Sequence, residues 1–107
     1  IGSYSRLLCS SDDYSGESMV TSCAPERFKN TQKGKIEVQK HSLIGSGVLI
    51  MPSVTLAQGS SIGAMSMVKD STKPFGIYAG IPAKRIKERS KKLLKLEKEF
   101  LDSIKGE

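Results

Sequence analysis

Residues 38–68 read VQKHSLIGSGVLIMPSVTLAQGSSIGAMSMV, and this stretch decides the fold. An aliphatic side chain returns at every sixth position within it, at Val38, Ile44, Ile50, Leu56, Ile62 and Val68. About a quarter to a third of positions would be aliphatic by chance, so six in succession indicate a repeat. The residue after each of these anchors is often small, as at Gly45, Ala57 and Gly63, with Met51 as the exception.

A period of six matches neither the 3.6-residue repeat of a helix nor the simple alternation of a flat strand. It predicts a coil of three short strands per turn, in which small residues allow tight corners. One turn takes 18 residues, so residues 33–68 supply two stacked turns with the anchors inside a three-sided core. Ile1 and Leu7 continue the spacing. The alternative is a set of ordinary β-strands with chance spacing, and the many Val, Ile, Ser, Thr and Gly residues disfavour a helix.

The flanking segments lose the period. Residues 9–35 are polar and rich in turn formers, which predicts a loop protruding from one corner of the coil. Residues 69–74 form a turn and residues 75–80 a last strand, after which we expect a C-terminal helix over 84–107. Apolar residues recur at helical spacings within that helix, and its narrow stripe must bury against the coil or a neighbouring subunit. We therefore expect one domain, with coils over 1–83 followed by the helix.

Composition narrows the class of protein. The 107 residues suit one small domain, and the first residue is not Met, so we expect the C-terminal part of a longer chain. No apolar run approaches a membrane span. Two cysteines without metal-ligand spacing predict free thiols in a cytoplasmic protein, with no metal site. The formal net charge is +6, and the basic residues concentrate near the C-terminus. They form either a solvated helix face or a surface that attracts phosphate groups. Few aromatic residues argue against nucleic-acid binding.

The repeats, together with residues 79–84 (Ala-Gly-Ile-Pro-Ala-Lys), resemble the hexapeptide-repeat acyltransferases. Within that family the chain resembles the galactoside, maltose and streptogramin O-acetyltransferase branch, whose closing motif differs by one residue, Asn in place of Ile81. The resemblance implies a mainly β fold, a left-handed parallel β-helix with a protruding loop and a C-terminal α-helix. It also implies a homotrimer, with the active site between adjacent coils and the loop covering a neighbour's site.

The resemblance implies an acetyl-CoA-dependent O-acetyltransferase that acts on a sugar hydroxyl. An amino-sugar N-acetyltransferase and a non-catalytic β-helix trimerisation module are the alternatives. A γ-type carbonic anhydrase shares the coil but binds zinc with three histidines, and this chain has one. A sugar nucleotidyltransferase would need a glycine-rich nucleotide motif, which the sequence lacks.

The resemblance also assigns the coenzyme A contacts. It places Gly63, Ala64 and Ser66 against the pantetheine arm, Ile81 and Pro82 against the adenine, and Lys84 and Arg85 near the phosphates. A purely structural interpretation is also available for several of these residues. Gly63 and Ala64 also suit a corner of the coil, and Lys84 and Arg85 also suit the solvated start of a helix.

The general base has more than one candidate. His41 is the one imidazole of the chain and falls near a corner, so it is the first candidate, although a surface turn would also suit it. Relatives in this branch carry their catalytic histidine at the start of the loop, where this chain has Asp12 and Asp13 instead. We therefore also consider these two carboxylates, which would need desolvation to act near neutral pH. They also suit a solvated turn.

Overall fold

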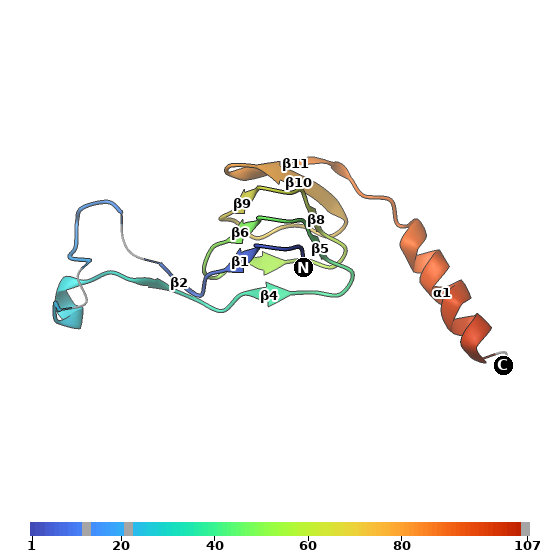
Figure 1. Ribbon diagram of the computed structural model, residues 1–107, viewed down its shortest axis with the longest axis horizontal. Coiled ribbons are helices and arrows are strands. Elements are labelled where there is room, and N and C mark those ends of the chain that lie inside the picture. Colours follow the sequence, from blue (N-terminus) through green and yellow to red (C-terminus); the bar gives the residue numbers. More distant parts are fainter. Residues whose placement is uncertain (12–13, 21–22, 106–107) are drawn as a thin grey trace.

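The computed structural model describes residues 1–11, 14–20 and 23–105. Short strands dominate, and a single α-helix follows them (Figure 1). The strands of the coil are β1 (Arg6–Leu7), β4 (Glu37–Val38), β5 (Leu43–Ile44), β6 (Leu49–Ile50), β7 (Thr55–Leu56), β8 (Ser61–Ile62), β9 (Met67–Val68) and β10 (Gly76–Gly80). The remaining elements are β11 (Ala83–Glu88), α1 (Lys92–Lys105) and, in the loop, β2 (Ser10–Ser11), β3 (Gln32–Lys33) and the 3₁₀ turn η1 (Glu26–Phe28).

The strand registers give the length of one turn of the coil. Val38 pairs with Leu56, Ile44 with Ile62, and Ile50 with Val68, in parallel strand pairs whose partners stand 18 positions apart. The predicted period is therefore confirmed. β1 pairs with β6 in the same parallel sense across the long insertion.

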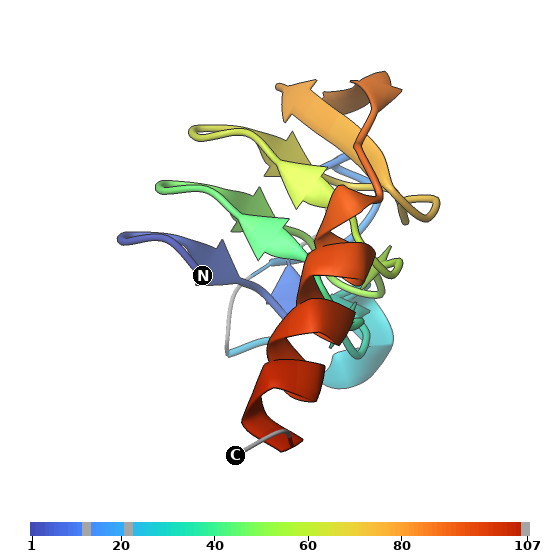
Figure 2. The same cartoon turned by 90° about the vertical axis from the view of Figure 1, so that its right-hand side faces the viewer.

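The coil has three faces. The first holds β1, β6 and β9, the second β4 and β7, and the third β5, β8, β10 and β11. We name the edges between them by what lies there. The histidine edge comprises residues 39–42 and 57–60, the hairpin edge residues 45–48 and 63–66, and the loop edge residues 51–54. Figure 2 shows these turns stacked on one another.

The core consists of the predicted anchors. Ile44, Ile50, Leu56, Ile62 and Val68 are at most 2% exposed, and they form one cluster with two further buried residues, Val48 and Val54. Because stacked turns bury each anchor on its neighbours, this ladder removes its apolar surface from water. Val38 departs from the prediction, since its side chain is 42% exposed in the lowest turn, where no described turn lies beneath it.

The corners depend on left-handed backbone conformations, which most residue types avoid. Equivalent positions in successive turns adopt them: His41 and Gly59 on the histidine edge have φ of 64° and 75°, and Gly47 and Met65 on the hairpin edge have 68° and 61°. Glycine serves this conformation without a steric cost, whereas His41 and Met65 adopt it with a side chain attached.

The segment that follows β10 differs from one expectation. We expected a helix from residue 84, but Ala83–Glu88 form strand β11, which pairs antiparallel with β10. The residues of this segment suit a helix, yet β10 offers an edge of unpaired backbone groups immediately before the turn at Ile81 and Pro82. Pairing with that edge satisfies both backbones, and tertiary context overrides the local propensity.

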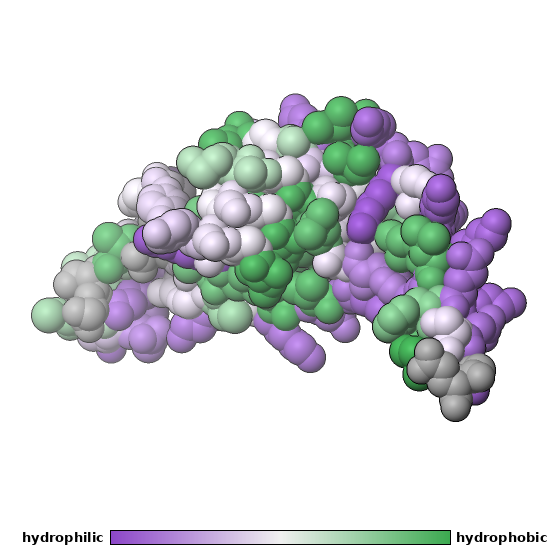
Figure 3. Space-filling model, turned by 45° about the vertical axis from the view of Figure 1, so that its right-hand side comes forward, coloured by the Kyte–Doolittle hydropathy of each residue, from purple (hydrophilic) through white to green (hydrophobic). Residues whose placement is uncertain are grey.

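The helix α1 therefore begins at Lys92, where the backbone N–H donates to the Ser90 hydroxyl. It lies beside the coil, with its hydrophobic side toward the coil and its hydrophilic side away from it (Figure 3). None of its residues is buried. At the other end of the molecule, residues 9–35 leave the coil through the antiparallel pair β2–β3 (Figure 1). No helix among the described residues is both long and apolar enough to cross a bilayer.

Candidate functional site

The hairpin edge brings together most of the predicted coenzyme A contacts. The turn between β10 and β11 lies next to the corner at residues 63–66. The Gly80 N–H donates to the Ser66 hydroxyl at 3.1 Å, and the Gly63 N–H donates to the Tyr78 carbonyl at 2.8 Å. A Cβ at Gly63 would lie 3.2 Å from the Cβ of Ala79, so a small residue is needed for this approach.

Exposure divides these residues into two groups. Ala64, Ile81 and Pro82 are exposed, so their surfaces are accessible to a ligand. The Ser66 side chain is buried and its hydroxyl is already bonded to the hairpin. Ser66 therefore shapes this edge by holding the hairpin in place.

The two basic residues of the motif separate in space. Lys84 stands opposite Ala79 in the hairpin, close to the turn. The guanidinium of Arg85 instead lies over the start of β10, where a Cβ on Gly76 would be 3.1 Å from its Nη1. The structure therefore gathers Lys84 with the exposed hairpin residues, and it directs Arg85 toward the opposite end of the strand.

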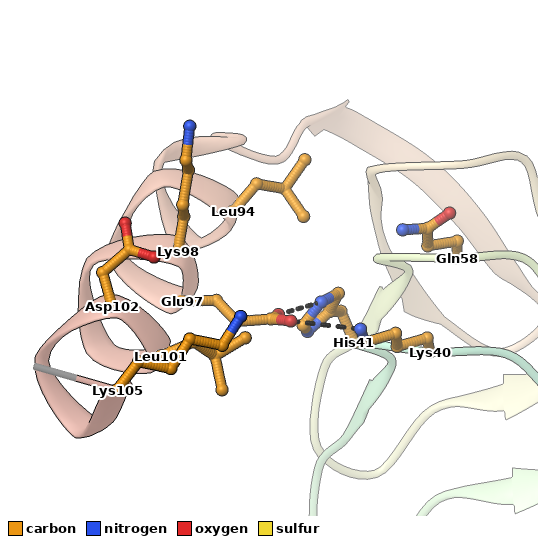
Figure 4. Close-up of a pocket in the computed structure, with 9 residues that line it drawn as sticks. All are labelled: Lys40, His41, Gln58, Leu94, Glu97, Lys98, Leu101, Asp102 and Lys105. Carbon is orange, nitrogen blue, oxygen red and sulfur yellow. Dashed lines mark hydrogen bonds and ion pairs between the residues drawn. The ribbon is translucent and has the colours of Figure 1, made fainter.

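His41 lies on a different edge of the coil, against α1. Its Nε2 is 2.5 Å from Oε2 of Glu97, and the Nζ of Lys40 is 3.0 Å from the other carboxylate oxygen (Figure 4). The His41 side chain is 20% exposed. Its carbonyl accepts a hydrogen bond of 2.7 Å from Arg89, whose same nitrogen also donates to the Gly59 carbonyl one turn away. Both the ring and the backbone of His41 are thus held.

A pocket of about 380 Å³ opens between this edge and α1. Its lining combines both charge signs with an apolar part, and Figure 4 shows the imidazole and the Glu97 carboxylate meeting inside it. The lining residues are Lys40, His41, Gln58, Leu94, Glu97, Lys98, Leu101, Asp102 and Lys105. An imidazole paired with a carboxylate beside an open space can accept a proton from a bound molecule.

Two contributors to this pocket were not identified as functional residues from the sequence. In the sequence, Glu97 falls within the apolar stripe of the C-terminal helix, and Arg89 is one of the basic residues near the C-terminus. A signal for Glu97 does exist, since it is the one acidic residue among the apolar side chains of that stripe. Arg89 gives no such signal, because its partners are backbone carbonyls far away in the sequence.

The remaining candidates, Asp12 and Asp13, lie outside the described residues. Among the residues that the structure does describe, no three His, Cys, Asp or Glu side chains gather closely enough to hold a metal ion. The predicted base His41 and the predicted coenzyme A contacts occupy separate edges of one chain. A single site that used both would therefore need surfaces from two copies of the chain.

Comparison with known proteins gives relatives of one kind. No protein-family model matches the chain. It is 41% identical over all 107 residues to a dTDP-4-amino-4,6-dideoxy-D-glucose acyltransferase of Escherichia coli, and covers 56% of that protein. The structure matches AntD, an N-acyltransferase from Bacillus cereus in complex with dTDP and 3-hydroxybutyryl-CoA, with a TM-score of 0.88 and 39% identity; the match covers 96% of this chain and 55% of AntD.

A galactoside acetyltransferase in complex with coenzyme A matches with a TM-score of 0.70 and 26% identity, over 86% of this chain and 42% of that enzyme. The chain thus spans little more than half the length of the E. coli acyltransferase and of AntD. The fold, including α1, lies within the part that is shared with AntD, since 96% of the chain is covered.

Proposed function

Because this chain belongs to the hexapeptide-repeat acyltransferases, we propose that it transfers an acyl group from a coenzyme A thioester to a sugar acceptor. The observation that carries the proposal is the hairpin edge, where exposed apolar residues and Lys84 gather beside a glycine corner. Two related structures with coenzyme A ligands support it. A left-handed coil, a homotrimer and a cytoplasmic location belong to the same proposal.

On the donor side, the hairpin edge would bind coenzyme A lengthwise. Gly63 and Ala64 would contact the pantetheine arm, because their small side chains leave the backbone accessible. Ile81 and Pro82 would pack against the adenine with their exposed apolar surfaces, and Lys84 would contact a phosphate. Arg85 would reach a phosphate only after its side chain turns away from Gly76.

The chemistry is a direct transfer without a covalent enzyme intermediate. A base takes the proton of the acceptor while the acceptor atom bonds to the thioester carbon, and backbone N–H groups stabilise the oxyanion that forms. The carbon–sulfur bond then breaks, and the thiolate leaves and receives a proton. We assign the base to His41, because its imidazole lies beside a pocket with one nitrogen held by Glu97. Asp12 and Asp13 are the alternative.

The acceptor atom is either oxygen or nitrogen. The resemblance of the sequence to the galactoside branch supports a hydroxyl. A specific observation supports an amine: the E. coli relative is named for an amino sugar and AntD is an N-acyltransferase. An amine is also the better nucleophile toward a thioester once its proton has been removed.

The test is thiol release from acetyl-CoA by the intact protein, measured with matched acceptors. We would compare dTDP-4-amino-4,6-dideoxyglucose with dTDP-glucose, which lacks the amine, and with a methyl galactoside. We expect acceptor-dependent release of one thiol for each acylated product. Release with the amino sugar alone identifies nitrogen, and release with the galactoside identifies oxygen. No acceptor-dependent release with any of these compounds would contradict the proposal.

The assignment of the base is tested with His41→Ala. We expect turnover to fall by about a hundredfold or more, and free imidazole in the buffer to restore part of it. An unchanged rate would move the role of base to Asp12 or Asp13. Asn substitutions at those two positions complete the comparison.

A further inference from the structure

We propose that Glu97 is a positioning residue for His41: its carboxylate holds the imidazole in the tautomer that leaves Nδ1 free to accept a proton. The inference rests on the proposed function, in which His41 is the base. It adds a residue of the C-terminal helix that neither the sequence motifs nor the coenzyme A edge involves. The pair is visible in Figure 4, where the carboxylate of α1 meets the ring from the coil.

The position of Glu97 on α1 is unusual for a solvated acid. At 100° per residue, Leu93 and Ile104 lie on one side of it and Leu94 and Leu101 on the other, so the carboxylate stands in the middle of the apolar arc. Charged residues of an amphipathic helix normally occupy the opposite face. A carboxylate in this place needs a specific partner, and its partners are the two side chains of the histidine edge.

The two partners use different oxygens of the carboxylate. Lys40 contacts Oε1 and remains 68% exposed, whereas His41 contacts Oε2, an atom that is buried. The Lys40 contact is thus an ordinary surface ion pair, which contributes little. The His41 contact is shielded from water, because Oε2 is buried and the ring nitrogen lies 2.5 Å from it.

The backbone of His41 gives an independent indication. His41 occupies a left-handed corner that Gly59 fills one turn later, and a side chain at φ of 64° is tolerated where surrounding contacts enforce it. Arg89 clamps the carbonyl at this corner, and Glu97 fixes the ring. Met65 adopts the same conformation on the hairpin edge, but His41 is held at both its carbonyl and its ring, which limits the positions that the imidazole can take.

The proposed role follows from the two ring nitrogens. When Nε2–H donates to Glu97, Nδ1 carries the lone pair and takes the acceptor proton as the new carbon–oxygen or carbon–nitrogen bond forms. The imidazolium that results is stabilised by the adjacent carboxylate. The same proton then passes to the departing thiolate, and this returns the pair to its starting state. Glu97 acts through His41 and needs no contact with the acceptor.

The test compares four substitutions in the intact protein, with acetyl-CoA and dTDP-4-amino-4,6-dideoxyglucose as probes. Glu97→Gln keeps the size of the side chain but can offer the ring its amide. We expect it to lower kcat by at least about tenfold, with KM for the acceptor within about twofold. Lys40→Ala removes only the exposed half of the contact and should change kcat by less than about threefold. Glu99→Gln, on the hydrophilic side of α1, should leave both constants unchanged. Glu97→Asp should restore part of the activity.

Several results would overturn the inference, and they separate it from the proposed function. Equal losses in Glu97→Gln and Lys40→Ala, together with faster hydrogen exchange throughout α1, would mean that Glu97 only docks the helix. Full activity of His41→Ala would contradict the roles assigned to His41 and Glu97, but it would leave the proposed acyl transfer in place. An inactive parent protein with all probes would overturn both proposals. Hydrogen exchange of the coil identifies any variant that fails to fold.

Discussion

The coil and the helix α1 are held in opposite ways. In the coil, aliphatic side chains stack in a closed interior, with five anchors at most 2% exposed. In α1, no residue is buried, and the helix meets the coil through one carboxylate with an imidazole and an ammonium as partners. Apolar burial stabilises without regard to direction, whereas a polar contact fixes the orientation of particular atoms.

This difference separates scaffold from site. The faces of the coil repeat a buried aliphatic anchor at every sixth position from Ile44 to Val68, because each of these anchors must fit the neighbouring turns. The edges carry what varies: a hairpin, a histidine and a long loop. Candidate chemistry therefore collects on the edges and on α1, where packing constrains residue choice least.

The largest expected effect is in the interior. Ile50→Ala removes three side-chain carbons from a fully buried position and should lower the free energy of unfolding by about 3 kcal/mol. Denaturant unfolding of the intact protein measures it. Leu43→Ala, at an exposed position of β5, is the control and should cost less than about 1 kcal/mol. Equal losses would mean that the ladder is not the principal source of stability.

The second-largest loss of stability should come from substitutions at the corners of the coil. A Cβ at Gly45 would lie 2.8 Å from the backbone nitrogen of Ala64 and 3.0 Å from the carbonyl of Ile62, so Gly45→Ala forces stacked backbones apart. We expect a loss of about 2 kcal/mol in the same denaturation experiment. Gly63→Ala is the matched control, since its nearest neighbour is a side-chain methyl at 3.2 Å. A larger loss at Gly63 would contradict this account of the corners.

A buried polar contact tests how the segment between β9 and β10 is held against the coil. The Thr72 hydroxyl accepts a 3.0 Å hydrogen bond from the Ala57 N–H and lies 2.6 Å from the Ser60 hydroxyl. Thr72→Val keeps the shape but leaves that N–H unpaired, and should cost about 1–2 kcal/mol. Ser71→Ala removes an exposed bond to the Thr55 N–H and should cost less. The reverse order would show that water reaches the Thr72 site.

The smallest effect on global stability should come from α1. Glu97→Gln should change the free energy of unfolding by less than about 1 kcal/mol, because no residue of α1 is buried and its ion pairs with the coil are partly exposed. Hydrogen exchange measured by mass spectrometry resolves the two regions. We expect any acceleration to stay within residues 92–105, while exchange in 43–68 is unchanged. Acceleration that spreads into the coil would show that the two regions open together.

The sequence predicted the coil well because its rule is local and repeated. Six anchors at fixed spacing gave the 18-residue turn, the parallel pairing and most of the core. The rule did not predict the exposure of Val38, because the burial of an anchor also depends on whether another turn lies beneath it. It did not predict β11 either, since residues 83–88 have a composition that suits a helix and form a strand only because they pair with the edge of β10.

The site was less accessible to sequence reasoning. The hairpin edge could be anticipated through the closing motif, and His41 through its being the only imidazole. The contact with Glu97 joins positions 56 residues apart through a helix whose start was misplaced. Likewise, no sequence pattern indicates that the Arg89 guanidinium would bind the carbonyls of two successive corners.

The most direct test of the account is a footprint of coenzyme A on the intact protein by hydrogen exchange. Ligand bound along the hairpin edge should slow exchange in residues 63–66 and 78–84, where backbone groups meet the proposed pantetheine and adenine contacts. The interior strands should stay as they were. Slowed exchange confined to other segments, with residues 63–66 and 78–84 unchanged at saturating coenzyme A, would contradict the assignment of this edge to the acyl donor.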